Sequence, residues 1–220
     1  MLFRSNSLRS PDGSLPANFR EWVLPGAHSD IGGGYLPLDT ENLIVAPVET
    51  LQGIDRDWPH SSFADQRLGR LRQQLIGEGW LGIHNQSHSR YYIDVERRNQ
   101  PRAEGPVLLK LRLEREVRGE YSRIPLRLMH ELAHRQGVPF NSFKADHADW
   151  QLPEELEPIH QLLRAHVLED SPLQLTAEME ALLKQRYVHH SHHYGVVGHI
   201  FQPHKPTRGK RAIHPNHPAG

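Results

Sequence analysis

The sequence predicts a mixed α/β protein, and three patterns support this prediction. Residues 90–99 and 106–117 alternate apolar and polar side chains, which is typical of half-buried strands. Longer segments repeat apolar side chains at the three-to-four-residue spacing of amphipathic helices. A short apolar segment at residues 19–24 is a further candidate strand, because Pro25 and Gly26 end it.

The expected elements follow one another along the chain. After the strand at 19–24, residues 64–80 are expected to form a surface helix that ends near Gly77 to Gly79. Residues 90–99 and 106–117 form an antiparallel pair, because the turn-forming sequence QPRAEG separates them. Residues 121–137 form a helix with Gly137 as its cap. Residues 153–170 and 176–187 form two further helices, each with acidic residues in its first turn. The apolar positions expected on the inner faces of the first two helices are Leu68, Leu71, Leu75, Ile76, Ile124, Leu128 and Leu132.

Composition excludes several classes of protein. The 220 residues carry 26 basic and 26 acidic side chains, so no overall field favours nucleic acid as a partner. The chain has no cysteine, which excludes disulfides, thiolate zinc sites and a cysteine nucleophile. The amino terminus lacks the apolar core of about 7–15 residues that a signal peptide needs. No apolar segment approaches the roughly 18 residues that a membrane-spanning helix requires.

The most informative segment is PGAHSDIGGGY, residues 25–35. Its three glycines lack the G-x-G-x-x-G spacing and the GK[ST] sequence of phosphate-binding loops, and Pro37 follows closely. A glycine-permitted bend after a strand explains the glycines. It does not explain His28, which directly follows the candidate strand where an α/β hydrolase carries its catalytic base.

This loop resembles that of the type VI secretion phospholipase effectors, in the first of the Tle groups, which carry P-G-[VA]-H-S-D-[VI]-G-G-G-Y. The segments ENLIVAPVETL, LRLEREVRGEYSRIPLRLMHELAHRQGVPF, LTAEMEALLKQRYVHHSHH and KRAIHPN are also similar to the carboxy-terminal half of those effectors, in order and spacing. The resemblance implies the carboxy-terminal part of an α/β hydrolase with an appended helical and β-hairpin region. It divides the chain into residues 1–60, the end of the hydrolase core, residues 61–195, the helical and hairpin region, and residues 196–220, a basic tail.

The resemblance implies a Ser-Asp-His esterase that cleaves phospholipids without a cofactor or metal, with His28 as general base. Asp30 matches the family loop and is expected to orient His28 or the loop backbone, while the triad acid is expected upstream. No serine lies in a G-x-S-x-G nucleophile elbow, so the chain is expected to be a fragment that is inactive without an amino-terminal hydrolase half. The other implied partners are a phospholipid membrane surface, a secretion spike and an immunity protein. The implied location is the cytoplasm of the producing bacterium, followed by delivery to the target-cell periplasm without a signal peptide.

Two alternatives to a phospholipase remain open. The sequence HELAH, His130 to His134, satisfies H-E-x-x-H on a predicted helix, which is the pattern of a zinc metalloprotease, although Phe140 stands where a third ligand would fall. The chain could also be a non-catalytic interaction or membrane-docking module.

Histidine- and arginine-rich segments complete the list of candidate residues. The sequence HHSHHYG places His189 and His192 in a segment that resembles the effectors. Both are expected to pack or hydrogen-bond near the site, and neither is assigned a catalytic role. The arginines at 112, 115 and 118 stand among glutamates and are expected to form a solvated strand face.

Overall fold

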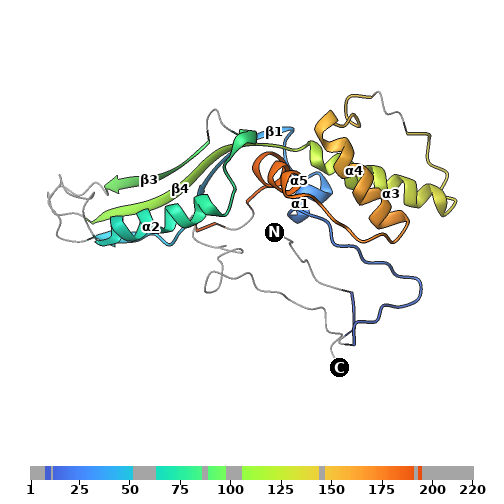
Figure 1. Cartoon of the computed structure of the whole chain (residues 1–220), viewed down its shortest axis with the longest axis horizontal. Coiled ribbons are helices and arrows are strands. Elements are labelled where there is room, and N and C mark those ends of the chain that lie inside the picture. Colours follow the sequence, from blue (N-terminus) through green and yellow to red (C-terminus); the bar gives the residue numbers. More distant parts are fainter. Residues whose placement is uncertain are drawn as a thin grey trace.

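The computed structural model describes residues 8–10, 12–51, 63–85, 89–97, 106–143, 147–190 and 193–194. The predicted basic tail at 196–220, the turn at 100–105 and His192 lie outside these residues. The described part is elongated (Figure 1). A sheet covered by helix α2 (Phe63–Gly77) forms one end. Helices α3 (Arg123–Arg135) and α4 (Glu157–Leu168) form the other end, and the short helices α1 (His28–Gly32) and α5 (Ala177–Leu182) lie between the two.

The sheet is built around one long strand, β4 (Val107–Arg118). Strand β3 (Arg90–Arg97) pairs with residues 107–114 of β4 and is antiparallel to it, as the sequence predicts. Strands β1 (Leu38–Ile44) and β2 (Glu49–Leu51) pair with β4 along its opposite edge, also antiparallel. The mixed helix and sheet content of the prediction is confirmed, and the sheet of the described residues is antiparallel throughout.

The predicted strand at residues 19–24 is wrong. These residues have no strand assignment, although Trp22 and Leu24 pack against the buried helical cluster. A strand needs a neighbouring backbone to pair with, and no described segment offers one here.

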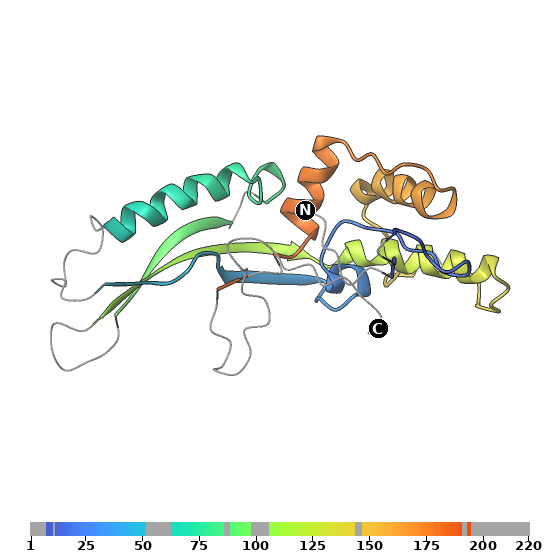
Figure 2. The same ribbon diagram turned by 90° about the horizontal axis from the view of Figure 1, so that it is seen from below.

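Helix α2 (Phe63–Gly77) covers one face of the sheet (Figure 2). Leu68 and Leu75 are buried against it, because they recur at the helical spacing that the sequence predicts. Ile76 was expected on the same face and instead is 43% exposed. The apolar side chains of α2 and of the sheet form one of the two buried clusters, here called the sheet cluster.

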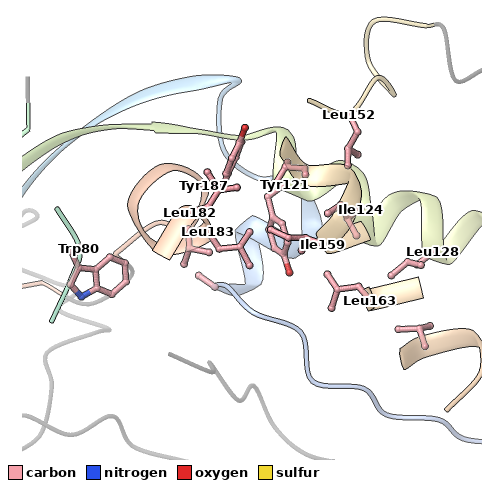
Figure 3. Close-up of a cluster of buried hydrophobic side chains, with 14 residues drawn as sticks. Trp80, Tyr121, Ile124, Leu128, Leu152, Ile159, Leu163, Leu182, Leu183 and Tyr187 are labelled. Atoms are coloured by element: carbon pink, nitrogen blue, oxygen red, sulfur yellow. The ribbon is translucent and has the colours of Figure 1, made fainter. Parts of the chain in front are cut away.

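The other cluster, here called the helical cluster, joins α3 (Arg123–Arg135), α4 (Glu157–Leu168) and α5 (Ala177–Leu182) (Figure 3). Thr176 caps the start of α5, where its side chain accepts the Met179 N–H, and the helix continues into a π-helical turn, Leu183–Tyr187. Short 3₁₀ turns at Ile83–Asn85, Glu120–Ser122 and Glu154–Leu156 complete the described helices.

Gly137 ends α3 as the sequence predicts. Its φ of +81° is left-handed, a conformation that favours glycine. The Gly137 N–H donates to His134 O and the Val138 N–H to Ala133 O, which is the Schellman arrangement of hydrogen bonds.

Arg115 corrects the expectation that the arginines of β4 form a solvated face. Its side chain is fully buried and forms an ion pair with Glu41 at 2.7 Å. Its two terminal nitrogens donate to the carbonyls of Lys184 and Val188, each at 2.7 Å. Side chains of a strand point alternately to its two faces, and position 115 follows Leu111 and Leu113 on the inward face of β4. Arg115 is therefore buried although its side chain is charged. Arg115 therefore connects the sheet to the segment after α5.

Candidate functional site

Helix α1 (His28–Gly32) is a single short turn that begins directly after Gly26. Gly26 has a φ of +110°, and a Cβ atom there would lie 3.0 Å from the Cβ of Asp30. Gly33 ends the helix with a φ of +74°. The glycines of the loop thus permit the sharp bends on either side of the helix.

Asp30 is the buried centre of this loop, with only 4% of the residue exposed. Its Oδ2 accepts the Ala27 N–H at 2.7 Å, which closes the first turn of α1 on itself. Its Oδ1 lies 2.6 Å from His189 Nδ1, and the His189 backbone N–H donates to the same carboxylate at 3.2–3.3 Å. The carboxylate thus holds the loop backbone, and in the described part of the chain no hydrogen bond joins it to His28.

His189 lies at the end of the segment after α5, 159 residues from Asp30 in sequence. Its side chain is 2% exposed, and its ring stacks on Tyr35 with 3.5 Å between centroids. Because a carboxylate accepts only, Nδ1 carries the proton of the hydrogen bond. Nε2 is buried and has no hydrogen-bond partner among the described residues.

A second buried carboxylate, that of Glu41, holds the next residue. Its Oε1 accepts the His190 N–H at 2.7 Å, while its Oε2 pairs with Arg115. Two consecutive residues of the carboxy-terminal segment, His189 and His190, are therefore held by carboxylates from α1 and β1. This places the segment after α5 against the loop.

His28 is exposed, and Asp30 on the same helix is buried. Within the described ranges His28 has no hydrogen-bond or ion-pair partner. An imidazole at the surface of such a loop can accept a proton from one group and return it to another. The two predicted site residues thus lie on one short helix and face different surroundings.

Tyr35 closes the loop on the side of His189. Burial, together with the nearby charges of Asp30 and Glu41, raises the pKa of the Tyr35 hydroxyl. The ring therefore covers His189 as a neutral aromatic group.

The H-E-x-x-H sequence lies on α3, and its geometry does not favour a zinc site. His130 Nε2 lies 3.0 Å from the Asn141 carbonyl oxygen, so this nitrogen donates a proton and has no lone pair for a metal. Hydrogen bonds from Arg164 and Arg135 hold the pKa of Glu131 below its usual value. Among the residues that the structure describes, no group of three or more His, Asp or Glu side chains could hold a metal ion.

Sequence reasoning did not find the role of His189. The segment RYVHHSHH drew attention to this residue, but contact with Asp30 depends on how α5 packs against β4. The signal that could have indicated burial is the position of His189 directly after the apolar residues of the last helical turns.

Neither family models nor curated proteins gave a match to the sequence. Among solved structures, the chain is similar to the Tle1 effector bound to the VgrG spike from the Type 6 secretion system, with a TM-score of 0.63 and 23% sequence identity. The similarity covers 82% of this chain and 38% of the effector. No helix in the described part of the chain has the length and apolarity to cross a membrane. At this level of identity the likeness concerns the fold, and the chain shares its fold with part of the Tle1 effector.

Proposed function

We propose that this chain is the part of a type VI phospholipase effector that supplies the proton-transferring histidine. The observation that carries the proposal is the loop at residues 25–35. It presents an exposed His28 on a short helix whose backbone is fixed by a buried carboxylate. The likeness in fold to the Tle1 effector supports the same conclusion.

His28 has the role of general base and acid in this proposal. Its imidazole accepts the proton of a serine hydroxyl as that oxygen attacks the ester carbonyl of a phospholipid. It then returns the proton to the leaving alcohol oxygen, and a water molecule repeats the sequence to release the fatty acid. The reaction needs no metal and no cofactor.

Asp30 and His189 act as the support of this loop. Asp30 accepts hydrogen bonds from the Ala27 N–H and from His189, and among the described residues no hydrogen bond joins its carboxylate to His28. The acid that orients His28 is therefore expected from the hydrolase segment that also carries the nucleophile. Precise placement of a catalytic group depends on such buried supporting contacts.

The nucleophile is expected from a second hydrolase segment. The 220 residues contain no G-x-S-x-G sequence, and they cover 38% of the effector that they resemble. The proposal therefore includes an amino-terminal hydrolase half as partner, a phospholipid membrane as substrate, and a secretion spike and an immunity protein as further partners. It also includes synthesis in the bacterial cytoplasm and delivery to the periplasm of the target cell.

The test is the release of fatty acid from phospholipid vesicles. The purified chain is expected to release none above buffer, because loss of the nucleophile costs roughly six orders of magnitude in a triad enzyme. The chain joined to the complementary hydrolase segment of the Tle1 effector is expected to release fatty acid from the vesicles catalytically. Hydrolysis by the purified chain in proportion to its concentration would contradict the proposal.

A non-catalytic docking module is the second candidate, and one surface favours it. Leu126, Met129 and Phe140, on and just after α3, are between 45% and 64% exposed. Apolar side chains grouped in this way often mark an interaction surface. If the joined protein binds vesicles without hydrolysing them, and Met129→Gln removes that binding, the docking module is the better description.

A further inference from the structure

A cavity of about 410 Å³ adjoins the loop that carries His28. This volume lies within the range of roughly 300–1,000 Å³ that is common for small-molecule sites. The cavity is bounded by the start of the loop, by the turn after α2 and by α5 with its π-helical turn. Its lining includes Trp80, Leu173, Leu175, Ala177 and Ala181.

Most side chains of this lining are apolar. Leu173 and Leu175 precede α5 and pack against the helical cluster. Ala177 and Ala181 are four residues apart on α5, so they face the cavity one above the other. Trp80, at one end of the helical cluster in Figure 3, is 1% exposed and forms part of the wall.

The polar side chains of the wall that come from the turn after α5 already have partners in the protein. The Lys184 ammonium donates to the carbonyl of Glu78. The Gln185 amide donates to the Gly79 carbonyl at 3.2 Å and accepts the His84 N–H at 3.2 Å. A ligand rich in hydroxyl or phosphate groups would therefore find few partners at this wall, whereas an apolar chain needs none.

The location of the cavity connects it to the proposed chemistry. Pro25 and Gly26 form part of its wall, and His28 stands two residues further along the chain. Among the charged side chains of the lining the two exposed carboxylates, Glu78 and Glu180, outnumber Lys184, which disfavours the entry of an anionic headgroup. A lipid would therefore enter with its hydrocarbon chain first and leave its headgroup outside the cavity.

We propose that this cavity binds one acyl chain of the phospholipid substrate. The proposal rests on the proposed function, because the acyl chain and the ester bond that His28 serves belong to one molecule. Burial of hydrocarbon against the partly exposed Leu173 and Leu175 and against the alanines of α5 provides the binding free energy. The depth and width of the cavity then determine which acyl chains are accepted.

The experiment uses lysophosphatidylcholine with a brominated acyl chain, below its micelle concentration, and the emission of Trp80 in a chain whose other three tryptophans are replaced by phenylalanine. A bromine atom quenches tryptophan at short range, so the brominated lipid is expected to reduce the emission and the unbrominated lipid is not. Ala181→Phe and Ala177→Phe each place a ring in the cavity and are expected to weaken binding by at least about tenfold. Ala177 is exposed, which makes its variant the safer of the two for folding.

Glu178→Phe is the matched control, since Glu178 is exposed on the same helix and is not part of the lining. It is expected to leave the quenching unchanged. The proposal would be overturned if the brominated lipid did not quench the unmodified chain, or if the quenching persisted in both Ala177→Phe and Ala181→Phe. Binding does not require the serine, so a chain that binds the lipid but never supports hydrolysis would refute the proposed function and leave the cavity assignment intact.

Discussion

Replacement of Asp30 by alanine would leave three buried N–H groups without their acceptor. These are the backbone N–H of Ala27, the backbone N–H of His189 and the Nδ1–H of the His189 ring. Each buried donor left unpaired costs about 1–3 kcal/mol of unfolding free energy, and the costs of donors that share one acceptor do not add fully. We therefore expect Asp30→Ala to lower the free energy of unfolding by about 3–5 kcal/mol, a large part of the stability of a typical domain.

The assay is urea unfolding of the chain followed by circular dichroism. Asp30→Asn keeps one oxygen acceptor and is expected to lie between the wild type and Asp30→Ala, at a cost of about 1–3 kcal/mol. Asp149→Ala is the control, because the Asp149 side chain is 83% exposed, and it is expected to stay within about 0.5 kcal/mol. If Asp30→Ala also stayed within about 1 kcal/mol of the wild type, the carboxylate would not hold the loop, and our description of the site would be refuted.

Three further predictions concern the surroundings of the site. Arg115→Met leaves the Glu41 carboxylate buried without its partner and is expected to cost about 3–5 kcal/mol in urea unfolding. Arg115→Met combined with Glu41→Gln is expected to cost less, because the amide oxygen introduced by the second substitution still accepts the His190 N–H. The pKa of Glu131 is lowered by hydrogen bonds from its two arginine partners, so the stability that it contributes is present above its ordinary value of 4.5 and is lost as the pH falls through the lower folded value. Glu131→Gln should therefore cost less than about 1 kcal/mol at pH 7, as the carboxylate is partly exposed, and nothing at low pH. Elemental analysis should find no stoichiometric zinc on the chain, and one zinc per chain that is lost with His130→Ala would restore the metalloprotease alternative.

The sequence predicted those elements that depend on local periodicity. Helix α3 and its glycine cap, and the antiparallel pairing of β3 with β4, follow from spacings of three to four and of two residues. The segment at 19–24 has a similar apolar pattern, but a strand also depends on a partner backbone, which local sequence does not contain. Arg115 was predicted to face solvent because it is charged. The alternation of β4 instead indicates the core at this position, where the structure places it.

The site was predicted in part, for a related reason. The glycine-bounded loop with His28 and Asp30 is continuous in sequence and could be identified there. The contact between Asp30 and His189 joins residues 159 positions apart, and it exists because α5 and its π-helical turn direct the chain back across β4. Neither residue spacing nor composition predicts that the chain passes back across β4 and brings His189 to Asp30.

The most direct test of the proposed role of His28 is the rate of phospholipid hydrolysis by the joined enzyme with and without the His28 imidazole. His28 is exposed, so His28→Ala is expected to change the free energy of unfolding by less than about 0.5 kcal/mol. We expect kcat to fall by roughly six orders of magnitude, to the level of buffer, because a triad without its base loses nearly all of its catalysis. Full activity in the His28→Ala enzyme would contradict this role and would transfer the function of base to another histidine, with His189 as the first to examine.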